Sequence, residues 1–192
     1  MPREALPSVA AKRETATMNR DELAATIKRH AYLEGDFVLR SGRRSRFYLD
    51  KYLFETQPEI LRALGTLFAE HVTPRTTLIG GAELGGIALA AAASMASGKP
   101  FVIIRNAKKD YGTGKAYEGR LSPGDVVLLV EDIATTGGQV LEAAQVIRDA
   151  GAEVEKIVAV IDRLEGAREN ILSAGYPFDS LFTLHDLGIV RT

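Results

Sequence analysis

Cysteine is absent from this 192-residue sequence, so the chain can form neither a disulfide nor a thiolate metal site. That absence fits a reducing compartment, and we expect a cytoplasmic protein. The sequence also lacks an apolar run long enough to cross a bilayer and an apolar N-terminal segment typical of a secretory signal. We therefore expect no membrane partner.

No sign of charge dominates, because the formal net charge is -1 and the isoelectric point is about 6.3. This balance gives no general attraction for nucleic acid, which is not expected as a partner. A composition that is 46% hydrophobic and 26% charged indicates a globular chain with an ample core. Residues 1–18 lack periodicity and predict a flexible extension, whereas residues 19–192 predict a single domain.

Strands and helices alternate through the middle and end of the sequence. Buried strands are predicted at residues 77–79, 101–105, 126–130, 155–161 and 180–184, and helices at 84–96 and 139–150. This alternation predicts an α/β fold with a parallel sheet flanked by helices. Upstream, the patterns predict a helix over 19–33, a β-hairpin over 35–50 and a helix over 56–71.

Residues 125–138, DVVLLVEDIATTGG, carry the strongest chemical signal. An apolar strand ends at two acids, Glu131 and Asp132, and a Thr- and Gly-rich turn then leads into a helix. Hydroxyls, glycine N–H groups and the positive helix end can together bind a phosphate, while the carboxylates accept hydrogen bonds from vicinal sugar hydroxyls. The pattern therefore predicts a site for a phosphorylated sugar. The alternative is an ordinary turn between a strand and a helix.

The same stretch resembles the motif with which type I phosphoribosyltransferases bind 5-phosphoribosyl 1-diphosphate (PRPP). Glu131 stands where that family often has Asp. The resemblance implies a catalytic role for Asp132 and a PRPP-binding set that comprises Glu131, Asp132, Ala134, Thr135, Thr136, Gly137 and Gly138.

Two further segments bear on the diphosphate. Residues 80–86 follow a strand and are glycine-rich, which indicates either a second anion loop or close packing of a helix on a strand. Gly85 stands where some orotate enzymes have lysine. The long polar segment 105–119 predicts a functional loop, with a solvated surface loop as the alternative. It resembles the catalytic loop of orotate phosphoribosyltransferases, which implies PRPP contacts from Arg105, Lys108, Lys109 and Tyr111, with Lys109 catalytic.

The predicted hairpin resembles the hood that covers the base in orotate phosphoribosyltransferases, with residues 19–55 as hood and 56–192 as core. Asp162 and Arg163 resemble the Asp-Arg pair that meets the orotate carboxylate in that family. The resemblance implies an orotate-binding set of Arg40, Tyr48, Thr135 and Arg163. For Tyr48 and Arg40 the alternatives are strand packing and a surface base.

The resemblance implies an enzyme that converts orotate and PRPP into orotidine 5′-monophosphate and diphosphate in pyrimidine biosynthesis. Mg²⁺ would be held by diphosphate and ribose oxygens with several waters, so we expect no metal ligand set in the protein. A homodimer that shares loop 105–119 across its interface is also implied. Transfer to another base, or a PRPP-binding regulator without turnover, are the alternatives.

Overall fold

The computed structural model describes residues 18–38, 42, 44–106 and 116–190. Its centre is a six-stranded sheet in the order β5-β4-β3-β6-β7-β8. The strands are β3 (Leu78–Ala82), β4 (Phe101–Ile104), β5 (Tyr117–Glu118), β6 (Val126–Ala134), β7 (Glu153–Asp162) and β8 (Phe178–Thr183). Neighbouring strands are parallel except for the antiparallel pair β4 and β5. The predicted α/β class, a parallel sheet flanked by helices, is confirmed.

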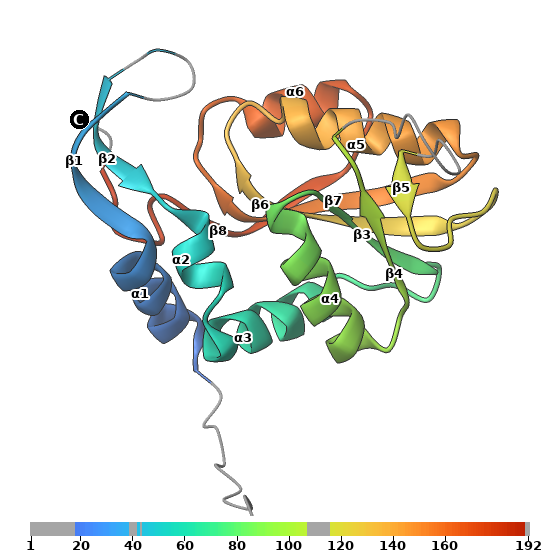
Figure 1. Ribbon diagram of the computed structural model, residues 1–192, viewed down its shortest axis with the longest axis horizontal. Coiled ribbons are helices and arrows are strands. Elements are labelled where there is room, and N and C mark those ends of the chain that lie inside the picture. The colour runs from blue at the N-terminus through green and yellow to red at the C-terminus, as the bar shows by residue number, and fades with distance from the viewer. Residues whose placement is uncertain (1–17, 39–41, 43, 107–115, 191–192) are drawn as a thin grey trace, which may run out of the picture.

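Helices cover both faces of this sheet, as Figure 1 shows. One face carries α3 (Pro58–Ala69) and α4 (Gly85–Ser97), and the other carries α5 (Gly138–Asp149) and α6 (Ala167–Ser173). Side chains of β6 alternate between the two cores, with Leu128 in the first and Leu129 in the second. Because β6 is buried on both faces, its sequence is continuously apolar from Val126 to Val130.

The N-terminal part forms a smaller unit beside the sheet. It comprises α1 (Arg20–Ala31), the antiparallel hairpin of β1 (Tyr32–Val38) and β2 (Arg44–Leu49), and a short helix α2 (Lys51–Glu55). Asn19 and Glu22 form a capping box that starts α1. The Asp50 side chain caps α2 by accepting a hydrogen bond from the Tyr52 backbone N–H at 3.1 Å. The hairpin was predicted, whereas α2 was not.

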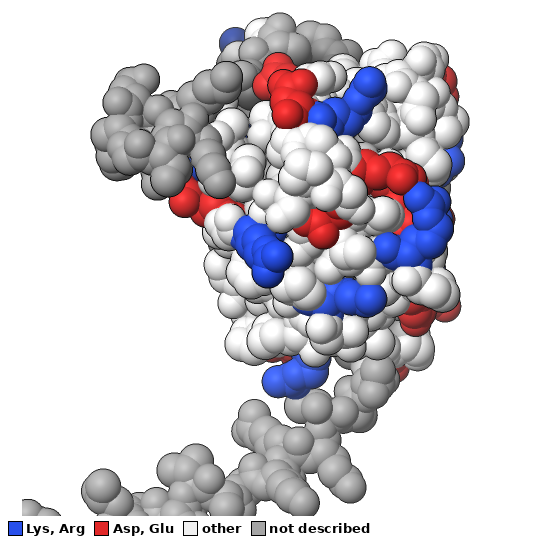
Figure 2. All heavy atoms as spheres, turned by 90° about the vertical axis from the view of Figure 1, so that its right-hand side faces the viewer, with Lys and Arg blue, Asp and Glu red and all other residues white. Residues whose placement is uncertain are grey.

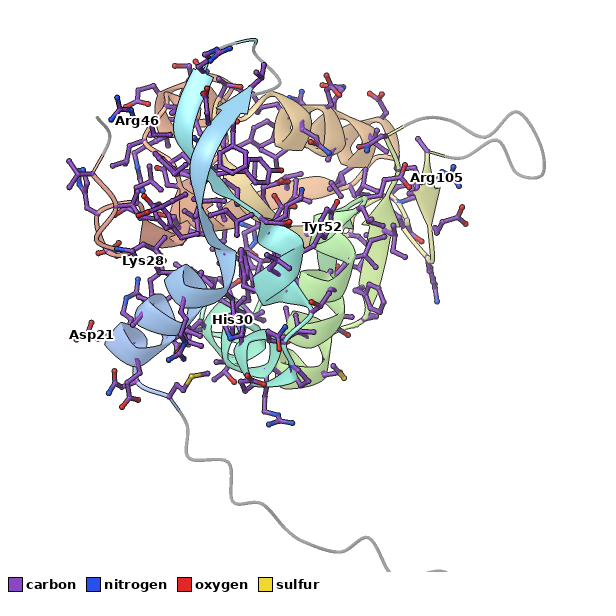
Figure 3. All side chains as sticks on the ribbon, turned by 60° about the vertical axis from the view of Figure 1, so that its left-hand side comes forward. Asp21, Lys28, His30, Arg46, Tyr52 and Arg105 are labelled. Atoms are coloured by element: carbon purple, nitrogen blue, oxygen red, sulfur yellow. The ribbon has the colours of Figure 1, made fainter. Side chains whose placement is uncertain are left out.

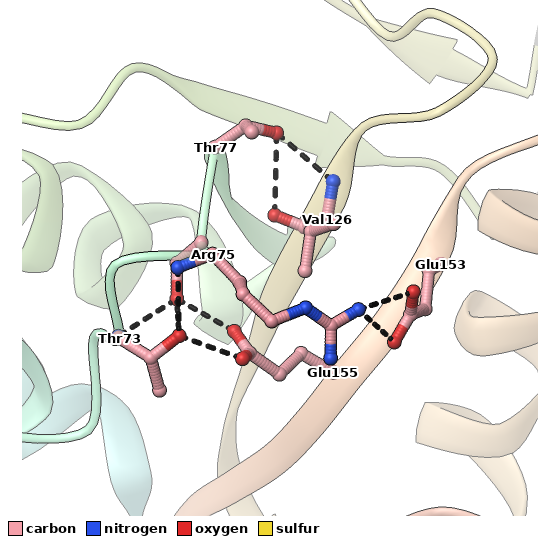
Figure 4. A network of polar contacts seen from close by, with 7 residues as sticks. Thr73, Arg75, Thr77, Val126, Glu153 and Glu155 are labelled. Atoms are coloured by element: carbon pink, nitrogen blue, oxygen red, sulfur yellow. Dashed lines mark hydrogen bonds and ion pairs between the residues drawn. The ribbon is translucent and has the colours of Figure 1, made fainter.

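A polar network joins the amino-terminal ends of three strands, at the end of the sheet opposite their carboxyl ends (Figure 4). The buried Thr76 hydroxyl donates to Glu155 Oε2 at 2.6 Å. The Thr77 hydroxyl accepts a hydrogen bond from the Val126 N–H at 2.9 Å. These contacts join the chain before β3 to the first residues of β6 and β7. The strands are thereby kept aligned, so that their carboxyl ends finish side by side.

Two predicted boundaries are wrong. The acids do not end the central strand, because β6 continues through Glu131 and Asp132 to Ala134, paired with β7 as far as Asp162. The segment 105–119 is not wholly irregular either, since Tyr117–Glu118 pairs with β4 as strand β5. The longer strands carry the acid pair into the sheet itself, where the backbone fixes its position.

Surface charge and helix length bear on possible partners. On the side that Figure 2 turns toward the viewer, basic and acidic side chains are interspersed rather than segregated by sign. That face therefore offers no large field of one sign to a polyelectrolyte. Among the helices of the described residues, none is both long and apolar enough to cross a bilayer.

Candidate active site

The cradle, residues 134–138, lies where β6 ends and α5 begins. Gly137 caps α5 with φ 81°, a left-handed conformation that glycine adopts without strain. The Thr136 carbonyl accepts a hydrogen bond from Asn170 Nδ2 at 2.9 Å, which fixes the turn to α6. Thr135 is half-buried and Thr136 is exposed. The turn therefore keeps its hydroxyls and the first amides of α5 accessible to an anion.

A lysine of α2, the helix that follows the hairpin, contacts Asp132 of the acid pair, and the sequence analysis did not identify it. Lys51, the first residue of α2, places Nζ 2.5 Å from Asp132 Oδ2. Burial alone would lower the pKa of the Lys51 ammonium, but the charge of Asp132 and its hydrogen bond raise that pKa above the ordinary value. Lys51 therefore stays charged at neutral pH, and its ion pair with Asp132 connects α2 to β6.

Two further carboxyl groups surround this ion pair, and both resist ionisation. Burial raises the pKa of Glu131 well above its usual range, and the negative charge of Asp132 adds to the effect. Burial, reinforced by Asp132, raises the pKa of Glu55 to about 8. Among the described residues, Glu55 Oε1 and Glu131 Oε2 have no hydrogen-bond partner. The cluster therefore carries far less negative charge at neutral pH than three carboxyl groups would suggest.

The glycine-rich segment 80–86 includes the first residues of α4 and is packed against the acid pair. A Cβ on Gly81 would lie 2.2 Å from the Gly86 carbonyl O, so close packing of helix on strand requires glycine there. At Gly85 a Cβ would lie 1.9 Å from Asp132 Oδ2. The packing interpretation is therefore confirmed for Gly81, while Gly85 faces the acid pair. Whether the segment also binds an anion stays a prediction.

The segment predicted to form the catalytic loop begins at Arg105, directly after β4, and Figure 3 shows Arg105 apart from Tyr52 of α2. Arg105 Nη1 lies 3.3 Å from Glu118 Oε1, across the base of the loop. Asn106 contacts the glycine-rich segment, because its backbone N–H donates to Glu83 Oε1 at 2.8 Å. The remaining predicted loop residues, Lys108, Lys109 and Tyr111, lie outside the described residues.

The predicted base site lies between the hairpin and the end of β7. Arg163 donates its backbone N–H to the Ala134 carbonyl at 2.9 Å, so it adjoins the cradle directly. Its guanidinium lies 5.9 Å from the centre of the Phe47 ring and forms an ion pair with Glu165 at 3.0 Å. Tyr48 is partly exposed, and its ring lies 5.6 Å from that of Phe37. Arg40 lies outside the described residues.

The structure thus brings the acid pair, the cradle and Arg163 together, while Tyr48 lies on the hairpin. Sequence reasoning missed Lys51, Glu55 and Glu165. For Lys51 and Glu55 a signal existed, since two charged residues four positions apart share one helix face. That signal requires α2 to be recognised, and five residues are too few for a reliable helical period.

Comparison with known proteins identifies the class of protein that this fold and site define. Residues 54–173 match the model of the phosphoribosyl transferase domain. Two solved structures of similar fold cover most of both chains. Orotate phosphoribosyltransferase from Mycobacterium tuberculosis, in complex with PRPP, has a TM-score of 0.76 and 32% identity, covering 88% of this chain and 99% of that chain. The Aeropyrum pernix enzyme has a TM-score of 0.75 and 32% identity, covering 86% of this chain and 95% of that chain.

Relatives in sequence define the family more narrowly. Orotate phosphoribosyltransferase from Halobacterium salinarum is 45% identical over 168 residues, which are 87% of this chain and 95% of the relative. The Methanocaldococcus jannaschii enzyme is 42% identical over 153 residues, which are 80% of this chain and 87% of the relative. The chain therefore belongs to the orotate phosphoribosyltransferase family, within the type I phosphoribosyltransferases.

Proposed function

We propose that this protein transfers the phosphoribosyl group of PRPP to orotate, giving orotidine 5′-monophosphate and diphosphate in pyrimidine biosynthesis. One relationship carries the proposal: Arg163 donates its backbone N–H to Ala134, the first residue of the cradle. A guanidinium suited to a carboxylate thus adjoins a turn suited to a phosphate. Orotate and PRPP together present these two groups.

The cradle residues bind the 5′-phosphate in this proposal, and Asp132 accepts hydrogen bonds from the ribose hydroxyls. The base-binding set consists of Arg40, Tyr48, Thr135 and Arg163. The bond between C1 of the ribose and the diphosphate oxygen breaks, a bond from C1 to the orotate ring nitrogen forms, and the proton of that nitrogen passes to water or to the leaving diphosphate. Positive charge develops on the ribose and negative charge on the leaving diphosphate. Arg105, Lys108, Lys109 and Tyr111 contact the diphosphate, with Lys109 catalytic.

Mg²⁺ is the proposed cofactor, and its charge offsets that of the diphosphate when it is bound. Within the described ranges, no three His, Cys, Asp or Glu side chains are grouped to hold a metal ion. Asp132 is already paired with Lys51. We expect the ion to be coordinated by diphosphate and ribose oxygens with several waters rather than by a protein cage.

We further propose a cytoplasmic homodimer whose loop 105–119 serves the neighbouring subunit. The domain division into extension 1–18, hood 19–55 and core 56–192 belongs to the same proposal. The contacts of α2 with the core support treating hood and core as parts of one domain.

A product assay tests the proposal directly. Purified protein with PRPP, Mg²⁺ and orotate should form orotidine 5′-monophosphate, whereas uracil, hypoxanthine and adenine should give much less product. Preference for another base would refute the orotate assignment and keep phosphoribosyl transfer. PRPP binding without product from any base would instead favour the alternative function, a regulator that binds PRPP without turnover.

A further inference from the structure

We propose that Lys51 is a positioning residue of the active site, which holds the Asp132 carboxylate in place, and that Gly85 provides the space this ion pair needs. The inference rests on the proposed function only in assigning Asp132 to the ribose of PRPP. Neither residue belongs to the binding set that the family resemblance implies.

The geometry makes the ion pair and the glycine interdependent. Lys51 Nζ lies 2.5 Å from Asp132 Oδ2, and a Cβ on residue 85 would lie 1.9 Å from the same oxygen. Any side chain at position 85 therefore displaces the carboxylate from its place beside the lysine. The three residues come from α2, β6 and the start of α4. Because residue 85 is glycine, the ion pair between Lys51 of α2 and Asp132 of β6 can form.

The surroundings of the ion pair give Lys51 an electrostatic role as well. Glu55 lies one turn further along α2, and its Oε1 would lie 3.2 Å from a Cβ on residue 85. This oxygen is buried and has no hydrogen-bond partner among the described residues. Because burial raises the pKa of Glu55, the charge to be offset is that of Asp132, and Lys51 offsets it at the point where PRPP, a polyanion, has to approach. Asp132 Oδ1 accepts a hydrogen bond from the Ile133 backbone N–H at 2.5 Å, so contacts at both oxygens orient the carboxylate.

Calorimetric titration of PRPP in the presence of Mg²⁺ tests the role of Lys51. Lys51→Met should raise the Kd for PRPP at least tenfold, because Asp132 then loses both its orientation and its neutralising partner. Lys51→Arg keeps the charge and should recover part of the affinity. Lys99→Met removes a lysine between α4 and β4 as a matched control, and its Kd should stay within twofold of wild type. Thermal unfolding identifies variants that do not fold.

A double-mutant cycle tests the link with Gly85. Gly85→Ala should weaken PRPP binding at least tenfold in the wild-type background. In the Lys51→Met background the same change should cost less than about threefold, since the freed carboxylate can turn away from the new methyl group. Equal effects in both backgrounds would overturn the inference. So would a Lys51→Met variant that binds PRPP like the Lys99→Met control.

The two proposals fail in different ways. PRPP binding with the expected coupling, but without orotidine 5′-monophosphate formation, would refute the proposed reaction and keep the role of Lys51. Product formation without coupling would support the proposed reaction and refute the role of Lys51. A wild-type protein that does not bind PRPP would overturn both.

Discussion

The Asn106 side chain donates a hydrogen bond from Nδ2 to the Glu83 carbonyl O at 3.0 Å, and this contact joins two loops of the active site. Gln139, at the start of α5, donates from Nε2 to the same carbonyl at 3.2 Å and to Asn106 Oδ1 at 3.3 Å. Three segments far apart in sequence therefore meet at the base of the loop. Asn106 thus anchors the start of segment 105–119 to the glycine-rich segment and to α5.

Asn106→Ala should lower kcat/KM for PRPP by roughly fivefold to thirtyfold, because its two side-chain hydrogen bonds, together worth about 1 to 2 kcal/mol, are lost. Steady-state kinetics with PRPP varied measures the effect. Gln145→Ala is the control, since it removes an amide on the exposed side of α5 that bonds Asp149 at 2.7 Å. An Asn106→Ala variant as active as this control would contradict the anchoring role.

Lys109→Ala should lower kcat roughly 100-fold or more while PRPP still binds, because a cation over the leaving diphosphate matters most as charge develops. Turnover at saturating substrates and a separate PRPP titration distinguish the two effects. Unchanged turnover would remove Lys109 from the mechanism.

Arg163→Ala should lower kcat/KM for orotate about 100-fold, because a charge-assisted contact with the orotate carboxylate is lost. Activity with uracil, which lacks that carboxylate, should change much less. Arg168→Ala is the control, since that guanidinium lies over Phe178, 5.2 Å from the ring centre. Full orotate activity in Arg163→Ala would show that the base pocket is assigned to the wrong residue.

Glu55 should make the folded state less stable as pH rises from about 4.5 to 8. Burial, with Asp132 and Asp50 adding and Lys51 opposing, raises its pKa to about 8. Across this window the unfolded chain has lost the Glu55 proton and the folded protein still holds it, so raising pH favours unfolding. The stabilisation is complete below the unfolded pKa and is lost as pH rises toward the folded pKa.

Urea unfolding of wild type and Glu55→Gln at several pH values measures this contribution. The stability of Glu55→Gln relative to wild type should increase by up to about 1.4 kcal/mol per pH unit within the window. Glu59→Gln, on the exposed surface of α3, controls for the loss of one carboxylate. A difference between Glu55→Gln and wild type that stays constant from pH 5 to 8 would contradict the prediction.

A mixed dimer should recover activity if loop 105–119 serves the neighbouring subunit. Lys109→Ala impairs the loop and Asp132→Asn impairs the ribose contact. When the two are unfolded together and refolded, half of the dimers are mixed, and each has one intact site. Activity should return to roughly a quarter of wild type. With subunit exchange verified by mass spectrometry, no recovery would show that each loop acts on its own subunit.

The sequence predicted those parts of the site that lie close together in the chain. The apolar run before Glu131 predicted a strand buried on both faces, and the turn with Gly137 predicted a helix start at an anion site. Local patterns suffice there, because strand, acids and turn follow one another without interruption. The strand boundary was wrong because pairing with β7 carries β6 on to Ala134, and such pairing leaves no local signal.

The missed contacts depend on folding over long distances in sequence. Lys51 and Asp132 are 81 residues apart, and only the packing of α2 against the sheet brings them together. The need for glycine at position 85 likewise comes from Asp132 rather than from a turn. Neither relationship produces a local sequence motif, because the residues around Lys51 and around Gly85 form no pattern that points to Asp132.

The residue proposed to contact the base and the residue proposed to position the ribose contact lie on one short piece of chain, because Tyr48 near the end of β2 is three residues before Lys51 in α2. An exchange of hoods between enzymes of different base preference therefore has to choose its junction with care. Replacing the hood of this protein up to Leu49 would retain Lys51. Replacing it through Glu55 would remove Lys51 and leave Gly85 without the ion pair that it accommodates. A hood exchanged together with α2 is consequently interchangeable only if residue 85 is exchanged with it.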